Sequence, residues 1–389
     1  MQKPDREDQL YQYDDKKRSL AKRYENVKLV FDVVGGTVVP VVICVLLVLS
    51  GASLSLTKFL EHISGSYWLT VAAYLLVFIL LLGLAASPLA FYSGYIVDHK
   101  FGLSTQSVKD WLTDELKGLG LELAIGILAG SLLYYLILTT DIWWLVAAAL
   151  FAVFSILFSI ILPYVIMPIF YKVTPVTDQA LKDNLLEMSQ KMGARNIGRV
   201  LVADESRKSI RANAMFSGIG KSKTIVLFDT LIDRFTRREV VTVVAHELGH
   251  YVNKDIWKEA VTSGMLAVPS FFLADYVLKQ NAVGLGFSSV SDPAGIPIIF
   301  AVLIGVNFIL QPVSNWYSRV VERQADEFAL RAADDADAQA SAEKRLADLA
   351  LSVDRPNSAI EFFFYSHPSS SKRIKLAEDW KRIRPREVS

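Results

Sequence analysis

The sequence predicts an all-α membrane protein that crosses the bilayer several times and carries a small α+β region with the residues of a metal site. Three observations lead to this class: an apolar composition, long blocks of apolar residues, and one histidine motif between two of the blocks. Of the 389 residues, 52% are hydrophobic and only 21% are charged, and the mean hydropathy is +0.33. A soluble domain seldom has this composition, so we expect a polytopic membrane protein.

Six apolar blocks are long enough, or nearly so, to cross the ~20-residue hydrocarbon core of a bilayer. They cover residues 29–52, 67–95, 121–139, 142–170, 256–278 and 296–317. Polar residues inside these blocks are costly in lipid, so we expect them to face one another or a wet interior. Either an internal cavity or hydrogen bonding between helices accounts for them. They are Asp32, Glu122, Glu259, Asp275, Asn307 and Gln311.

The placement of lysine and arginine predicts the orientation. Residues 1–28 carry eight of them and the connection 98–120 carries three, whereas the other short connections are poor in both. By the positive-inside rule the N-terminus is cytoplasmic, and the alternation of spans returns the later polar regions to that face. The expected division is a cytoplasmic or interfacial segment 1–28, spans in 29–171, a catalytic region 172–255, a helical pair 256–318, and a cytoplasmic catalytic region 319–389. The net charge of +1 argues against a nucleic-acid partner.

The histidine motif is His246-Glu247-Leu248-Gly249-His250, an H-E-x-x-H pattern. Thr236 and Glu239 form a capping-box pattern, which predicts that a helix begins at Thr236. On that helix His246 and His250 lie one turn apart on one face and can share a metal. Glu247 lies beside them, where it can take a proton from a metal-activated water.

A catalytic zinc usually has three protein ligands and one open position. Glu322 follows the sixth block, on a helix that the topology returns to the same membrane face, and we expect it to be the third ligand of one Zn²⁺. Asp326, at i+4, is expected to orient a ligand histidine through its free ring N–H. Without the H-E-x-x-H motif, Glu322 and Asp326 would be interpreted as part of an exposed, charged face of a helix.

Two further features have open interpretations. Residues 211–217 and 224–228 predict two strands joined by residues 218–223, and the first strand either offers an open edge to an extended peptide or is a plain hairpin strand. His367 follows an aromatic run and precedes Pro368, so we expect it on a loop. It either donates a hydrogen bond to a developing oxyanion or has no role.

The ordered set of motifs resembles the type 1 CAAX prenyl proteases, which are integral-membrane zinc metallopeptidases. The segments that carry the resemblance are YSGY (92–95), GLSTQ (102–106), MPIF (167–170), Thr174-Pro175, Asn213-Ala214, IVLFDTL (225–231), HELGH (246–250), ERQAD (322–326), SHP (366–368) and Arg373.

The resemblance implies a zincin-like site in a ring of about seven transmembrane helices around an internal chamber, with the HELGH helix as the seventh. It implies that His246, His250 and Glu322 bind zinc and that Glu247 is the catalytic base. Asp326 would support a ligand, and His367 and Arg373 would lie close to the reacting centre. Asn213 and Ala214 would lie on the strand that aligns the peptide. The connection between Leu231 and His246 lacks the long charged insertion of eukaryotic members, which indicates a prokaryotic member.

The function that follows is a membrane-embedded zinc endopeptidase whose substrates are peptides or proteins, prenylated at a CAAX end in the family. We expect its active site on the cytoplasmic side of a bacterial inner membrane, or of the endoplasmic reticulum if the source is eukaryotic. A membrane-protein quality-control protease of the heat-shock type is an alternative, although such proteins are shorter and have fewer spans. A non-catalytic binding protein or transporter with a remnant metal site is a second alternative, against which the intact Glu247 argues.

Overall fold

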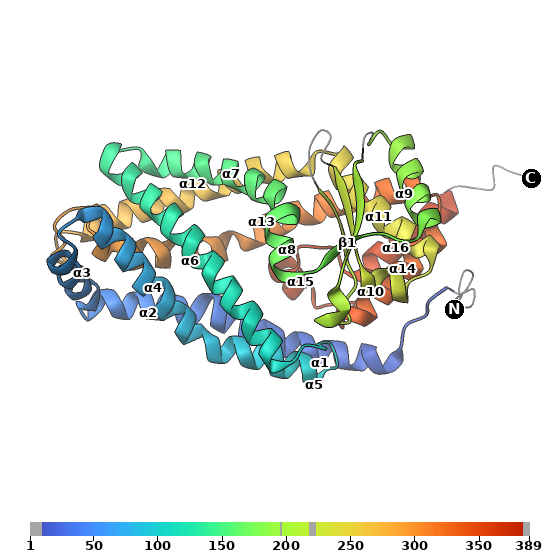
Figure 1. Ribbon diagram of the computed structural model, residues 1–389, viewed down its shortest axis with the longest axis horizontal. Coiled ribbons are helices and arrows are strands. Elements are labelled where there is room, and N and C mark those ends of the chain that lie inside the picture. Colours follow the sequence, from blue (N-terminus) through green and yellow to red (C-terminus); the bar gives the residue numbers. More distant parts are fainter. Residues whose placement is uncertain (1–9, 195–196, 218–222, 384–389) are drawn as a thin grey trace, which may run out of the picture.

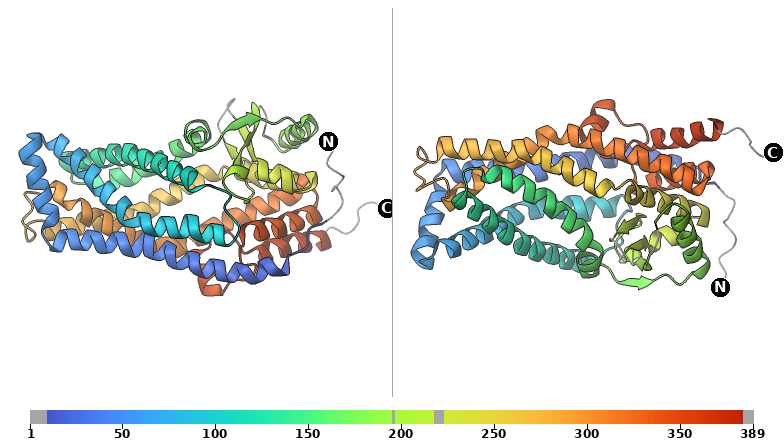
Figure 2. Two further views of the ribbon diagram at one scale, coloured as in Figure 1. Left: turned by 60° about the horizontal axis from the view of Figure 1, so that its bottom comes forward. Right: turned by 90° about the horizontal axis from the view of Figure 1, so that it is seen from above.

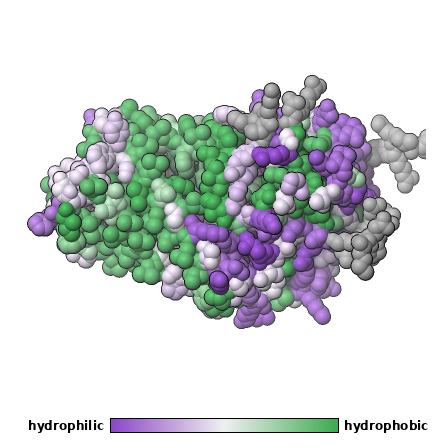
Figure 3. All heavy atoms as spheres, in the orientation of Figure 1, coloured by the Kyte–Doolittle hydropathy of each residue, from purple (hydrophilic) through white to green (hydrophobic). Residues whose placement is uncertain are grey.

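The computed structural model describes residues 10–194, 197–217 and 223–383 of an elongated molecule (Figure 1). Long helices occupy one end, and a small sheet with the shorter helices occupies the other (Figures 1 and 2). The surface follows this division, because hydrophobic residues cover the end with the long helices and hydrophilic residues gather at the end with the sheet (Figure 3). The expected loop 218–223 lies outside the described residues except for Lys223.

Six helical stretches in the described part of the chain are long and apolar enough to cross a membrane, which confirms the six predicted blocks. They run over Asp15–Leu49, Tyr67–Lys100, Val108–Thr139, Trp143–Phe170, Asp255–Asn281 and Pro293–Ala333. Their elements are α1 (Asp15–Val33), η1 (Val34–Val38), α2 (Val39–Leu49), α4 (Tyr67–Ala90), η2 (Phe91–Val97), α5 (Asp98–Lys100), α6 (Val108–Thr139), α7 (Trp143–Ile161), η3 (Leu162–Ile166), α8 (Met167–Phe170), α12 (Asp255–Asn281), η6 (Pro293–Gly295) and α13 (Ile296–Ala333). A short helix, α3 (Ala52–Ser64), joins the first two spans.

The spans form a closed ring. In turn, α7 contacts α12, α12 contacts α13, α13 contacts α2, α2 contacts α4, α4 contacts α6, and α6 returns to α7. A helix in a solid bundle buries the face that it turns to the centre. In the most apolar windows of the first and third spans, however, only 6% of the residues are buried. This low burial agrees with an internal chamber rather than a filled centre.

The HELGH helix is not among the six candidate spans. It forms α11 (Arg237–Val252), which has 16 residues, and its Val240, Val244 and Leu248 are buried in the core of the region that contains the sheet. The expectation of a seventh membrane helix at this position therefore differs from the structure, because the apolar side of α11 packs on protein.

A four-stranded sheet lies beside α11, in the order β1-β2-β4-β3. Its strands are β1 (Val173–Pro175), β2 (Arg199–Ala203), β3 (Ala214–Ser217) and β4 (Thr224–Phe228). β2 and β4 are parallel, and β1 and β3 are antiparallel to their neighbours, with Ala214 opposite Leu227. β3 is therefore an edge strand, and it contacts α11.

Shorter helices complete this end of the molecule. They are α9 (Gln179–Lys191), η4 (Glu205–Arg207), α10 (Asp229–Arg234), α14 (Ala336–Ala350), α15 (Ser358–Phe364) and α16 (Ser370–Ile383). The start of the chain docks on them: Arg18 forms an ion pair with Asp348 of α14 at 2.5 Å, and Tyr11 donates a hydrogen bond to the same carboxylate at 2.8 Å. The described part of segment 1–28 is thus continuous with the first span and also packs on α14.

Candidate metal centre and active site

The first feature of the site is the fixed start of α11. Thr236 accepts a hydrogen bond from the backbone N–H of Glu239, and a Glu239 side-chain oxygen accepts one from the backbone N–H of Thr236 at 2.8 Å, which confirms the predicted capping box. The Glu239 side chain is 1% exposed and also accepts a bond from Ser341 of α14 at 2.6 Å. The helix that carries the two histidines is therefore held at its first turn by a neighbouring helix.

Gly249, inside the HELGH motif, allows α11 and α13 to approach closely. A Cβ atom at this position would lie 3.1 Å from the Cα atom of Ala325, which is closer than side chains normally pack. Ala325 lies within one turn of Glu322 on α13, a continuous helix of 38 residues. The glycine thus lets the long helix bring Glu322 up to the histidines.

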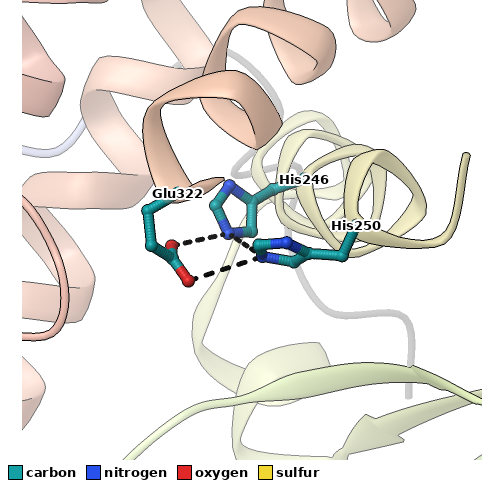
Figure 4. Close-up of side chains that lie close together, drawn as sticks. All are labelled: His246, His250 and Glu322. Atoms are coloured by element: carbon teal, nitrogen blue, oxygen red, sulfur yellow. Dashed lines mark hydrogen bonds and ion pairs between the residues drawn. The ribbon is translucent and has the colours of Figure 1, made fainter. Parts of the chain in front are cut away.

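The side chains of His246, His250 and Glu322 converge from these two helices (Figure 4). The Nε2 atoms of the two histidines lie 3.1 Å apart. Nε2 of His246 is 3.2 Å from Oε2 of Glu322, and Nε2 of His250 is 3.5 Å from Oε1. One ligand atom from each residue falls within 4.8 Å of the other two, which is the arrangement that one metal ion requires.

The other ring nitrogen of each histidine faces a buried carboxylate. Nδ1 of His246 lies 2.9 Å from Oδ1 of Asp326, as predicted, and Nδ1 of His250 lies 3.0 Å from Oδ2 of Asp255. Both acids are nearly inaccessible, with 1% of Asp326 and 2% of Asp255 exposed. Such acceptors place the proton on Nδ1 and leave the Nε2 lone pair free for a metal.

Asp255 is a site residue that the sequence reasoning missed. It lies five positions after His250, a spacing that does not share a helix face. The two helices are separated by Asn253 and Lys254, and the left-handed φ of 58° at Lys254 turns the chain so that Asp255 begins α12 beside His250. The available signal was the polar turn Asn253-Lys254-Asp255 directly after the motif.

The donor set fits a divalent metal by its own chemistry. Oε2 of Glu322 is buried, and within the described part of the chain it accepts no hydrogen bond. Its neighbour at 3.2 Å is Nε2 of His246, the nitrogen whose lone pair is left free for a metal. A buried carboxylate oxygen left in this way is costly unless a cation is bound to it. Two imidazole nitrogens and one carboxylate are a ligand set found in catalytic zinc sites.

Arg373, on α16, binds the carboxylate that faces His246. Its Nε atom donates to Oδ2 of Asp326 at 2.8 Å, one terminal nitrogen reaches Oδ1 at 2.5 Å, and the other lies 3.0 Å from Glu343 of α14. Burial raises the pKa of the Glu343 carboxyl above its ordinary value. Arg373 therefore holds Asp326, and one of its terminal nitrogens also lies 3.2 Å from Nδ1 of His246, so it lies close to the metal ligands. The structure adds Glu343 to the site, a residue that the sequence did not single out.

Glu247 lies where two cavities meet. A main cleft of about 810 Å³ is lined by Glu247, His250 and Glu322, and an inner pocket of about 130 Å³ is lined by Glu247, His246 and Asn213. Burial raises the pKa of the Glu247 carboxyl above its ordinary value, with nearby His246 and His250 opposing the rise. A carboxylate with a raised pKa is a stronger base, which is the property that proton abstraction from water needs.

The remaining predicted residues lie around this junction. Nε2 of His367 is 3.2 Å from Oε1 of Glu322, and the ring is largely exposed. Asn213 immediately precedes the edge strand β3 and lines the inner pocket, whereas Ala214 is buried and pairs with Leu227. The ring of Phe216 in the same strand packs at a tilt against Tyr251 of α11, with ring centroids 4.7 Å apart, which holds the strand against the helix.

Some polar residues of the spans form hydrogen bonds between helices and others line a cavity, which were the two expected explanations. Asp275 accepts the indole N–H of Trp143 at 2.7 Å, so this acid joins two helices. Ser270 and Asn307 make a longer contact of 3.5 Å between α12 and α13. Glu259, by contrast, lines the main cleft. The buried Asp275 thus serves packing, whereas the exposed Glu259 borders the site.

Comparison with known proteins agrees with this geometry. Residues 175–381 match the family described as "Peptidase family M48", and residues 7–172 match "CAAX prenyl protease N-terminal, five membrane helices". A protein that joins a ring of membrane spans to an H-E-x-x-H site with a distant glutamate is a polytopic membrane metalloprotease. The chain belongs to peptidase family M48.

Relatives cover most of the chain. "Uncharacterized metalloprotease YhfN" of Bacillus subtilis is 28% identical over 366 residues, which span 92% of this chain and 85% of that protein. "CAAX prenyl protease 1" of Saccharomyces cerevisiae is 31% identical over 313 residues, spanning 74% and 67%. The crystal structure of S. mikatae Ste24p has the same fold, with a TM-score of 0.77 at 24% identity over 94% of this chain and 89% of that one. The resemblance noted in the sequence is confirmed, and so are a hydrolase that acts on peptide or protein substrates and an integral membrane location.

Proposed function

We propose that the chain is a zinc endopeptidase that cleaves prenylated peptides or proteins near a CAAX-type C-terminus. The observation that carries the proposal is the convergence of His246, His250 and Glu322 beside Glu247, at the junction of the main cleft and the inner pocket. We assign the three converging residues as ligands of one Zn²⁺. The names of the yeast and other relatives support the substrate class.

In this proposal the chain's own residues handle the protons. A bound zinc would supply Lewis-acid polarisation of the water and of the scissile carbonyl. Glu247 takes a proton from the attacking water, the water oxygen bonds to the carbonyl carbon, and the peptide C–N bond breaks as Glu247 returns the proton to the leaving amine. His367, whose exposed ring lies beside Glu322, donates a hydrogen bond to the developing oxyanion. Asp326 keeps the His246 ring in place, and Arg373 holds Asp326.

The edge strand β3 is the proposed binding site for the substrate backbone. Because β3 pairs with β4 on one side only, an extended peptide can add to its other side beside Asn213 and Ala214. The main cleft is walled by apolar side chains from the ends of two spans, including Phe158, Leu162 and Trp257. Such a wall suits the isoprenoid of a prenylated cysteine.

We further propose that the site faces the cytoplasm, in a bacterial inner membrane or, for a eukaryotic source, the endoplasmic reticulum. The basic residues of segment 1–28 support the orientation, because the described part of that segment docks on α14 beside the site. The five-part division of the chain given above remains a prediction.

The test uses the full-length protein purified in detergent. We expect about one zinc per chain by elemental analysis. A farnesylated CAAX peptide should be cleaved, and its unprenylated counterpart should be cleaved more slowly, because it cannot bury the isoprenoid. Intact protein that contains zinc but cleaves neither peptide would refute the proposal. Cleavage of unprenylated misfolded membrane proteins alone would favour quality control instead.

Asp255 provides a prediction about the metal ligands. Replacing Asp255 with alanine removes the acceptor for His250 and should weaken zinc binding by about 10- to 100-fold. Asp255→Asn keeps an oxygen acceptor and should recover part of the loss. Competition with a chromophoric chelator measures both affinities, and equal zinc affinity in the wild type and Asp255→Ala would contradict the role.

A further inference from the structure

A cavity of about 390 Å³ lies on α13 directly after the apolar block 296–317, and it is here called the span-end cavity. Its size is that of small-ligand sites in proteins. Two apolar side chains, two arginines, one amide and one carboxylate line it: Trp316, Val320, Arg319, Arg323, Gln324 and Glu327. None of these residues lines the main cleft or the inner pocket, so the span-end cavity is separate from the metal centre.

The exposed side chains of α13 show which way the span-end cavity faces. Four exposed apolar residues recur every three or four positions and therefore lie along one side of the helix. They are Ile309, Val313, Trp316 and Val320. The exposed residues Asn307 and Ser314 lie on the opposite side. In a ring of spans the apolar side meets lipid and the polar side meets the wet interior. The span-end cavity shares Trp316 and Val320 with the apolar side, so it opens toward lipid at the end of the span.

The two arginines make the cavity cationic and leave donors free. Nε of Arg323 donates to Glu327 at 3.1 Å, which offsets one positive charge and leaves the lining with a single positive charge. One terminal nitrogen of Arg319 donates to the backbone carbonyls of Glu361, at 3.0 Å, and of Tyr365. Within the described part of the chain, the other nitrogens of these two arginines have no partner. Their N–H groups are therefore available to an anion.

We propose that the span-end cavity binds the headgroup of a phospholipid that carries one negative charge. Guanidinium groups suit the oxygens of a phosphodiester, and the single positive charge of the lining balances the single charge of such a lipid. The indole of Trp316 lies where tryptophan is favoured, at the boundary between hydrocarbon and headgroups. The acyl chains continue along the apolar side of α13, over Val313 and Ile309.

The span-end cavity adjoins the attachment of the segment that carries His367. Arg319 lines the cavity and also holds the carbonyl of Tyr365, two residues before His367. One turn earlier on α13, the buried Asn315 donates to the carbonyl of Phe363 at 2.6 Å. A headgroup bound to Arg319 adds a further constraint to this attachment. Because a ligand of the folded state stabilises it, the anionic lipid should raise the temperature of unfolding.

The experiment titrates the full-length protein in detergent with phosphatidylglycerol or phosphatidylcholine, and native mass spectrometry counts the lipid bound per chain. The wild type should retain phosphatidylglycerol in preference to phosphatidylcholine. Arg323→Gln leaves the lining neutral and should weaken phosphatidylglycerol binding about fivefold, whereas Glu327→Gln adds a net positive charge and should strengthen it about fivefold. Arg323→Lys keeps the charge and should recover part of the loss.

Arg331→Gln is the matched control. Arg331 is an exposed arginine in the last turn of α13, and it does not line the span-end cavity. This variant should bind phosphatidylglycerol as the wild type does. Without added lipid, Arg323→Gln should unfold at the wild-type temperature, since exposed ion pairs contribute little. With phosphatidylglycerol, the unfolding temperature should rise more in the wild type than in Arg323→Gln.

Each contrary outcome bears on one part of the proposal. Equal retention of the two lipids by the wild type, or equal phosphatidylglycerol affinity in the wild type and Arg323→Gln, would overturn it. A loss of the same size in Arg331→Gln would assign the binding to general surface charge and overturn the site. Glycerol phosphate, which has no acyl chains, should stabilise the protein less than the lipid, and equal stabilisation would overturn the lipid as the ligand. No peptide is cleaved in these measurements, so their outcome is independent of the proposed peptidase activity.

Discussion

Glu247→Gln should keep its zinc and lose about 10²- to 10⁴-fold in kcat, which is the usual contribution of a general base. Glutamine has nearly the same size as glutamate, but its neutral amide is not basic enough to take a proton from water. Its neighbours His246, His250 and Glu322 keep their ring and carboxylate partners, so the metal content should not change. Elemental analysis and cleavage of the farnesylated peptide, made on the same preparation, measure both quantities.

A matched control separates this effect from the removal of any one carboxylate of the protein. Glu187 lies on the exposed face of α9 and pairs with Lys191 at 2.7 Å. Glu187→Gln should leave both zinc and cleavage at the wild-type level, because exposed ion pairs contribute little. Residual cleavage by Glu247→Gln close to that of Glu187→Gln would assign the base to another residue.

The course of the chain through the membrane was predictable because hydrophobic blocks of span length have few other uses. The helix predicted to continue from the block 296–317 is confirmed, since the block and the polar residues after it form one helix, α13. The smaller elements were less predictable. β1 has only three residues, too few to show a strand pattern. α11 resembled a membrane helix by its valines, although these valines pack on protein.

The centre of the site was predictable from local spacing, and its periphery was not. His246 and His250 share a face by helix geometry alone, and the membrane topology returns Glu322 to them. Asp255 and Glu343 depend on how separate helices pack. Their positions follow from the turn at Lys254 and from the docking of α14 and α16, and neither has a spacing signal.

Asp326→Ala should cause the largest combined loss of stability and metal affinity. Asp326 is 1% exposed and balances the buried Arg373 while it accepts from His246. Breaking a buried ion pair on one side typically costs about 3–5 kcal/mol, because the remaining charge stays buried. Loss of the acceptor for His246 should also weaken zinc binding by about 10- to 100-fold. Thermal unfolding in detergent and chelator competition measure the two effects.

A double substitution separates the two roles of Asp326. Asp326→Ala combined with Arg373→Met removes both members of the pair, so the buried guanidinium that has lost one of its two carboxylate partners disappears, and part of the lost thermal stability should return. Zinc affinity should stay low, because His246 still lacks its acceptor. Asp326→Asn should show the reverse, since its amide oxygen can accept from His246 but carries no charge to balance Arg373. If stability and zinc affinity instead rose and fell together across the three variants, Asp326 would act only through the ion pair, and its role in orienting the ligand would be wrong.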